Sequence, residues 1–470
     1  MKKKVLANAT WLTGARLLGD ALSFVLFVII SREYGPEGVG QYSYAFALGG
    51  ILFAFVNFGV EDYAVRECSI VAKEQRAQFM SRLIFLQWIN LIIVSICLFL
   101  YLFNSGISEP EIKIISFLAI YHFILAFVRT LFSPSFAEQN MLGPAISELG
   151  SRIFAIISAI VAIKYFDSNL QTALFYYPVS GLLLLLFAIQ NLHTYSGKVT
   201  IRFDLKDLKK DVVKLWPFAA SVAVLYLYSR VDLIMIKNIL GDTQAGIYAS
   251  AVKFLEVSIV PLLFLGVAIY PMLSSSFRDD KRTFTDLAEK FFKSSLVIGS
   301  LIAWGLMFVV PVVISGLFGE KFADSIVVVK FLAVLALLMA VDVCAMRIML
   351  AMGLQVLRVK VLFFGTLLNI IINLVLIPIL GVIGAVVASI VTQLLINILY
   401  IFFMVDRTVS LTLFKVFLLF TIPIGSSSIT IWISSVLGYQ EWITATITLA
   451  VFLSLAAMTR FIVWPKKIAG

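Results

Sequence analysis

Long apolar segments separated by short polar connections run through the whole chain of 470 residues. Each is close to the ~20 residues that a helix needs to cross a hydrocarbon core about 30 Å thick. Charged residues make up only 14% of the chain, whereas soluble domains carry roughly 25%. We therefore predict an all-α polytopic membrane protein with little chain left for a soluble domain.

Fourteen transmembrane helices are predicted from these segments. In order they cover residues 8–30, 41–61, 81–103, 112–132, 147–163, 170–192, 212–236, 246–270, 291–314, 326–350, 356–378, 381–404, 413–436 and 441–463. The first follows Lys2, Lys3 and Lys4 but is long and contains Arg16 and Asp20, so we expect it to remain attached rather than to be removed as a signal peptide. An even number of spans places both termini on one side.

Lysine and arginine collect in alternate connections, which the positive-inside rule assigns to the cytoplasm. These cation-rich stretches are residues 2–4, 66–82, 198–214, 278–293, 358–360, 407–415 and 460–467. Residues 133–146 fit this pattern least, since they hold only Glu138, but their neighbours require them to be inside. We predict that both termini are cytoplasmic. The net charge of +10 reports membrane orientation, so no nucleic-acid partner is expected.

The chain looks duplicated, because glycine and tyrosine recur at a fixed distance. Gly35, Gly40 and Tyr42 are each followed 206 positions later by Gly241, Gly246 and Tyr248. Two six-helix lobes follow, each starting from the cytoplasm, and we expect a pseudo-two-fold axis along the membrane normal with a cavity between them. The predicted organisation is an N-lobe at 1–195, a basic cytoplasmic linker at 196–211, a C-lobe at 212–405, and two extra spans with a tail at 406–470.

Charged residues inside the spans are functional candidates by default, because an ionised side chain in lipid costs at least about 2.5 kcal/mol unless it is paired or hydrated. The candidates for a substrate cavity are Arg16, Asp20, Arg129, Arg230 and Lys253. Structural ion pairs are the alternative, since Arg16 and Asp20, like Lys253 and Glu256, are spaced to pair along one helix. Cations toward both faces could pass an anionic group between leaflets, because arginine matches phosphate oxygens.

Two other groups complete the candidate residues. Asn369 and Asn373 lie four apart on one helical face, where they either join helices or, with Asp232, offer oxygen ligands to a cation. Candidate gate and turn residues are Glu61, Arg66, Gly35, Gly241 and Arg347. No metal site, cofactor or enzymatic activity is expected, because the sequence contains none of the common catalytic motifs and its external connections are short.

Three stretches carry a resemblance to a known family. They read S-R-E-Y-G-P-E-G-V-G-Q-Y-S-Y-A at 31–45, R-V-D-L-I-M-I-K-N-I-L-G-D-T-Q-A-G-I-Y-A-S-A-V-K-F at 230–254 and L-L-N-I-I-I-N-L-V-L-I-P-I-L-G-V-I-G-A at 367–385. Together they resemble the polysaccharide-transporter branch, with its Wzx-type O-antigen flippases, of the multidrug/oligosaccharidyl-lipid/polysaccharide exporter superfamily.

The resemblance implies a MATE-like fold and alternating access. It further implies that an undecaprenyl-diphosphate-linked oligosaccharide is moved from the cytoplasmic to the periplasmic leaflet for O-antigen, lipopolysaccharide, capsule or exopolysaccharide synthesis. The cavity cations would bind the diphosphate, Na⁺ or H⁺ would couple at Asp232 and Asn373, and a polymerase and a chain-length regulator would be partners. The alternative is a cation-coupled multidrug antiporter of the MATE type, although Arg16, Arg129, Arg230 and Lys253 favour an anion.

Overall fold

The structure, a computed structural model, describes residues 2–166, 169–197, 199 and 205–405, and it is helical almost throughout. The helices up to the middle of the chain are α1 (Lys2–Asn57), α2 (Val60–Cys68), α3 (Lys73–Asn104), α4 (Glu109–Ala137), α5 (Leu142–Tyr165), α6 (Leu170–Leu174), α7 (Tyr176–Ser196) and α8 (Leu205–Leu240). Those that follow are α9 (Asp242–Ser258), α10 (Val260–Asp279), α11 (Lys281–Trp304), α12 (Val310–Phe318), α13 (Ala323–Ala351), α14 (Gln355–Leu380) and α15 (Val382–Val405). A π-helical turn, Gly305–Val309, and a 3₁₀ turn, Glu320–Phe322, flank α12.

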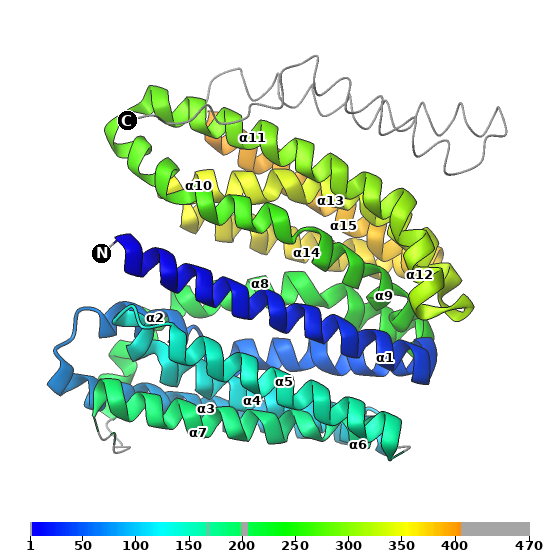
Figure 1. Cartoon of the computed structure of the whole chain (residues 1–470), viewed down its shortest axis with the longest axis horizontal. Helices are drawn as coiled ribbons and strands as arrows, with labels where there is room; N and C mark the ends of the chain where they lie inside the picture. Colours follow the sequence, from blue (N-terminus) through cyan, green and yellow to red (C-terminus); the bar gives the residue numbers. More distant parts are fainter. Residues whose placement is uncertain (1, 167–168, 198, 200–204, 406–470) are drawn as a thin grey trace. The chain divides into compact units, whose positions relative to one another are not determined.

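Eleven helical stretches among the described residues are long and apolar enough to cross a membrane. They account for the predicted spans up to residue 404, because α1 contains the first two of them. Gly35, with a φ of 64°, and Pro36 interrupt α1, and its ribbon turns back on itself there (Figure 1). The predicted spans at 413–436 and 441–463 lie outside the described residues, so the total of fourteen stays a prediction.

Helix packing divides the chain into a first unit, Met1–Gly246, and a second unit, Ile247–Gly470. In the first unit α1 packs against α4, α5 and α8, while α4 packs against α7 and α2. In the second unit α13 packs against α11 and α15, and α14 packs against α15. The division at the linker 196–211 and the lobe at 212–405 stay predictions.

The first residues of α8 are held in the first unit by polar contacts. Asp211 accepts hydrogen bonds from Arg82 of α3 at 3.0 Å and from Tyr63 of α2 at 3.4 Å. All three side chains are largely buried. These contacts fix this part of α8 against α2 and α3.

The two repeated turns meet each other through their glycines. A Cβ atom on Gly40 would lie 1.9 Å from the carbonyl oxygen of Asp242, and one on Gly246 would lie 1.8 Å from the carbonyl oxygen of Pro36. In the repeat, position 36 corresponds to 242 and position 40 to 246. The contact of Gly40 with Asp242 and the contact of Gly246 with Pro36 therefore join equivalent pairs of positions. Such reciprocity is the mark of a two-fold contact. Only glycine permits this backbone approach, which accounts for its recurrence in the repeat.

Candidate functional site

A break in the helix before α2 and a turn after α4 bring acidic and basic side chains together in the first unit. Phe58 and Gly59, with φ of 50° and 70°, separate α2 from α1 and set Glu61 in the first turn of α2. Gln139, with a φ of 57°, lies between α4 and α5. Glu148 and Arg152 then follow one turn apart near the beginning of α5, where residues four apart share a face.

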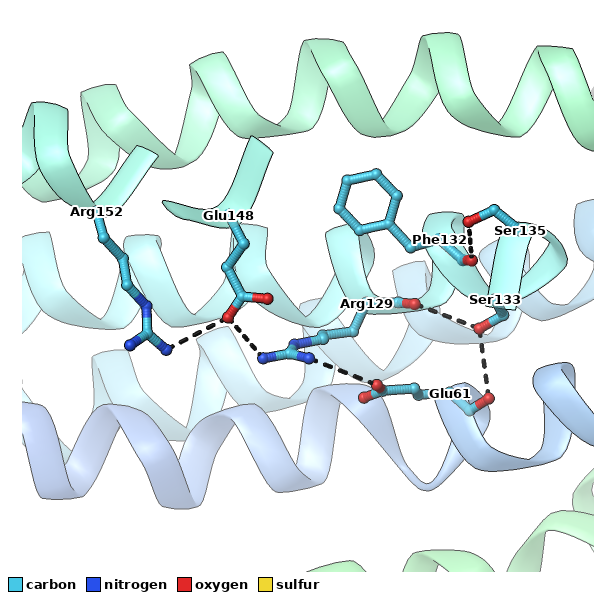
Figure 2. A network of polar contacts seen from close by, with 7 residues as sticks. All are labelled: Glu61, Arg129, Phe132, Ser133, Ser135, Glu148 and Arg152. Atoms are coloured by element: carbon cyan, nitrogen blue, oxygen red, sulfur yellow. Dashed lines mark hydrogen bonds and ion pairs between the residues drawn. The ribbon is translucent and has the colours of Figure 1, made fainter. Parts of the chain in front are cut away.

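Together with Arg129 of α4 and Asp20 of α1, these side chains form a network in which acids and bases alternate and Glu148 lies at the centre. Figure 2 shows Glu61, Arg129, Glu148 and Arg152 of this network. Arg129 Nη2 donates to Glu148 Oε1 at 2.9 Å, and its Nη1 lies 3.9 Å from Glu61 Oε1. Arg152 donates to the same Glu148 oxygen at 3.3 Å and to Asp20 Oδ1 at 2.9 Å. The network therefore joins α1, α2, α4 and α5.

The network carries three carboxylates and two guanidinium groups, so its formal charge is −1. Its four central side chains keep between 22% and 29% of their surface exposed, and Asp20 keeps 50%. They are thus neither sealed in the core nor free in solvent. Burial raises the pKa of Glu61, which lies outside the eleven candidate spans, and the positive charge of Arg129 opposes that rise.

A second ionic cluster lies at the other end of α4. Lys237 of α8 pairs with Glu111 of α4 and, at 2.8 Å, with Asp242 of α9. Its ammonium group lies 4.8 Å from the centre of the Tyr44 ring, and Tyr44 in turn hydrogen-bonds Tyr101 at 2.7 Å. The side chains of Lys237 and Glu111 are each only 9% exposed. This cluster fixes the α8–α9 turn, which carries Gly241 with a φ of 89°.

The contacts bring three of the sequence-predicted residues, Asp20, Glu61 and Arg129, into one network. Asp20 pairs with Arg152, whereas the side chain of Arg16, its predicted partner, lies outside the described residues. Arg230 and Asp232 are half-buried on α8, and Arg230 acts electrostatically on His122 of α4.

The remaining predicted residues take simpler places. Lys253 and Glu256 pair at 3.6 Å within α9, as their spacing predicted. Asn373 donates to Asn369 at 2.9 Å within α14, and both amides are buried. Arg347 lies against Gly266, while Arg66 is exposed and 4.0 Å from Glu67. Gly35 and Gly241 both adopt positive φ, as expected of turn residues.

Glu148 and Arg152 belong to the network but are not among the site residues predicted from the sequence. Their signal was present, since an acid and a base four residues apart stand at the start of the predicted span 147–163. What the sequence lacks is the packing of α5 against α1, which gives Arg152 its partner on another helix. Within the described part of the chain, no group of three or more His, Cys, Asp or Glu side chains could hold a metal ion.

The fold is that of transporters built from membrane helices. The structure of the lipid II flippase MurJ in an inward closed conformation superposes with a TM-score of 0.75 at 17% identity, covering 95% of this chain and 98% of that one. An inward-facing multidrug resistance MATE family transporter of the MOP superfamily matches with a TM-score of 0.67 at 15% identity, over 83% of this chain and 93% of that one. The predicted MATE-like fold is therefore confirmed.

The chain belongs to the polysaccharide biosynthesis protein family, whose model matches residues 5–277. The capsular polysaccharide biosynthesis protein CapF of Staphylococcus aureus is 22% identical over 84% of this chain and 98% of its own length. The lipopolysaccharide biosynthesis protein WzxC of Escherichia coli (strain K12) is 23% identical over 93% of this chain and 88% of its own length. The predicted family is thus confirmed.

Proposed function

We propose that this protein is a flippase that moves an undecaprenyl-diphosphate-linked oligosaccharide from the cytoplasmic to the periplasmic leaflet by alternating access. Membership of the polysaccharide biosynthesis family supports the glycan part of this proposal. Relatives named for capsular polysaccharide and lipopolysaccharide biosynthesis point the same way. The observation that carries the chemistry is a pair of arginines, Arg129 and Arg152, that share one carboxylate on membrane-embedded helices.

Arginine suits the head group of such a lipid. A guanidinium presents several N–H donors in a fixed plane and forms charge-assisted hydrogen bonds to phosphate oxygens. The polar head would exchange its water for these donors, while the polyprenyl tail stays in the bilayer. No covalent bond changes in this process, so the protein acts as a transporter and not as an enzyme.

Three further points belong to the same proposal. Both termini lie in the cytoplasm, as the distribution of lysine and arginine indicates. Na⁺ or H⁺ coupling involves Asp232, Asn369 and Asn373, whose oxygens suit a hard cation. In the outer leaflet, the flippase releases the lipid-linked oligosaccharide to a polysaccharide polymerase and a chain-length regulator.

The test is leaflet exchange of a fluorescent lipid-diphosphate oligosaccharide in proteoliposomes, with and without Na⁺ and H⁺ gradients. The wild type should exceed empty liposomes, and Arg129→Gln should reduce exchange about tenfold, which is the effect of removing one charge-assisted hydrogen bond. Lys113→Gln serves as the control, because Lys113 is exposed and pairs with Glu109 one turn away along α4. Exchange no faster than in empty liposomes would refute the proposal.

The alternative function is a cation-coupled multidrug antiporter. The fold does not discriminate, because MurJ and the MATE transporter are both similar to this chain. The excess of carboxylates over guanidinium groups in the network is the observation in its favour. In the same proteoliposomes, gradient-driven extrusion of a cationic dye without exchange of the glycolipid would establish it.

A further inference from the structure

We propose that Glu148 is an internal counter-ion that occupies the anion position between Arg129 and Arg152 and makes the site selective for doubly charged diphosphate head groups over singly charged monophosphate ones. This inference rests on the proposed function, and it assigns a role to a residue that binds no substrate itself. Glu148 acts through the arginines, so it is a positioning and specificity residue.

The geometry places one oxygen at the centre of the site. Glu148 Oε1 accepts from Arg129 at 2.9 Å and from Arg152 at 3.3 Å, so both guanidinium groups face the same point (Figure 2). Each arginine also has a carboxylate of its own, Glu61 for Arg129 and Asp20 for Arg152. Glu148 is therefore the one acid of the network that both arginines share.

The charges explain why this acid would act as a filter. Among the described side chains, the network with Glu148 in place has a formal charge of −1, so an incoming anion meets no excess of positive charge from them. A ligand must take over the hydrogen bonds that Glu148 makes. A head group with a single negative charge replaces the carboxylate without electrostatic gain, whereas a diphosphate brings a second charge and more oxygen acceptors to the same donors.

Position and exposure allow the exchange. The side chains of Glu148, Arg129 and Arg152 are 22%, 29% and 25% exposed, so a ligand can reach them without unfolding the helices. Among the described residues, both ion pairs of Glu148 are made by the same oxygen, so rotation of its side chain releases the two contacts together. The displaced carboxylate can then be hydrated, because the Glu148 side chain is already partly exposed.

The experiment measures binding of two geranylgeranyl lipids to the full-length protein in nanodiscs. In one a diphosphate joins the lipid to N-acetylglucosamine, and in the other a single phosphate does, so that as diesters they carry two charges and one charge. We expect the wild type to prefer the diphosphate at least tenfold. Glu148→Gln should bind both probes more tightly and reduce the preference to about threefold or less. Arg152→Gln should weaken diphosphate binding about tenfold. Glu138→Gln provides the matched control, since it removes the same charge from an acid that pairs with Lys73 and Arg76 outside the network.

Equal affinity of the wild type for the two probes would overturn the inference, and so would an equal change of preference in Glu148→Gln and Glu138→Gln. If Glu148→Gln does not fold, Glu148→Asp replaces it: a shorter acid should loosen the shared contact and lower the preference, and an unchanged preference would contradict the role. Leaflet exchange of the glycolipid is measured separately. A wild type that selects diphosphates but exchanges no glycolipid would refute the proposed function while leaving the role of Glu148 intact.

Discussion

At the level of single residues, the acids of the first unit find their cations mainly on other helices. Asp20 of α1 pairs with Arg152 of α5, and Glu148 of α5 pairs with Arg129 of α4 as well as with its own neighbour Arg152. Glu111 and Lys237 are likewise brought together from α4 and α8. Because a charge inside a span is costly when it is unpaired, these contacts also fix which helices lie together.

Glu138 allows a test of one such contact by pH. Burial alone would raise its pKa, but hydrogen bonds from Lys73 and Arg76 outweigh burial and hold the pKa below the usual 4.5. A carboxyl with a lowered pKa stabilises the fold above its ordinary pKa, and this stabilisation is lost as the pH falls through the lowered value. Glu138→Gln should therefore melt roughly 2 °C below the wild type at pH 7, and the difference should shrink as the pH falls below 4.5 and vanish below the lowered pKa.

Thermal unfolding of the detergent-solubilised variants between pH 7 and pH 4 measures this effect. Glu109→Gln is the control, because Glu109 pairs with Lys113 along the same helix and its side chain is 80% exposed. A melting difference for Glu138→Gln that persists unchanged at acidic pH would show that the contact with Lys73 and Arg76 is not electrostatic.

What the sequence could predict at this level depends on how local the interaction is. The positive φ of Gly35 and Gly241 and the pair Lys253–Glu256 followed from residues near in sequence, so a single helix or turn determines them. Arg152 and Glu111 were not selected, because their partners depend on which helices pack together. Sequence spacing gives the face of a helix on which a charge lies, but it does not give the helix opposite.

At the level of elements, the turn of α1 contacts the α8–α9 turn through the glycines that recur in the repeat. Gly246→Ala would place a Cβ atom 1.8 Å from the carbonyl oxygen of Pro36, so the backbone must move. We expect a loss of about 1–3 kcal/mol, the usual effect of overpacking a well-fitted site. Gly40→Ala should cost a similar amount, since its Cβ atom would meet the carbonyl oxygen of Asp242.

The double variant distinguishes this contact from two separate clashes. One displacement of the two turns relieves both, so Gly40→Ala with Gly246→Ala should cost less than the sum of the single changes. Gly50→Ala is the control in the same helix, because its Cβ atom would lie 3.5 Å from the ring of Tyr226 and alanine favours helix. Chemical denaturation of the purified variants measures these costs, and additive losses would argue against a shared contact.

For the whole molecule, bilayer thickness explains how far the sequence alone could go. A membrane helix must be about 20 residues long and apolar, so its position is visible in composition, and the predicted spans up to residue 404 recur as helices. The network of Asp20, Glu61, Arg129, Glu148 and Arg152 was visible only in part. Its members come from four helices, and no local pattern records how those helices pack.

Orientation is the property of the whole molecule that one helix can decide. The 32 residues of α3 rise about 48 Å at 1.5 Å per residue, which exceeds the ~30 Å hydrocarbon core, so its two ends must emerge on opposite sides. Cations gather in the first turn of α3, at Lys73 and Arg76, while Ser108 and Glu109 follow the helix. The positive-inside rule then places Glu74 in the cytoplasm and Ser108 outside.

Labelling single-cysteine variants with a membrane-impermeant maleimide tests this orientation, in a background where Cys68, Cys97 and Cys344 are replaced by serine. Both target positions are exposed, so access to reagent depends only on the side of the membrane. Ser108→Cys should react in intact cells, and Glu74→Cys should react only after permeabilisation. The reverse pattern would invert every connection from α1 to α15, because each crossing fixes the next. It would also turn the network of Arg129 toward the outer leaflet, where a substrate made in the cytoplasm could not first meet it.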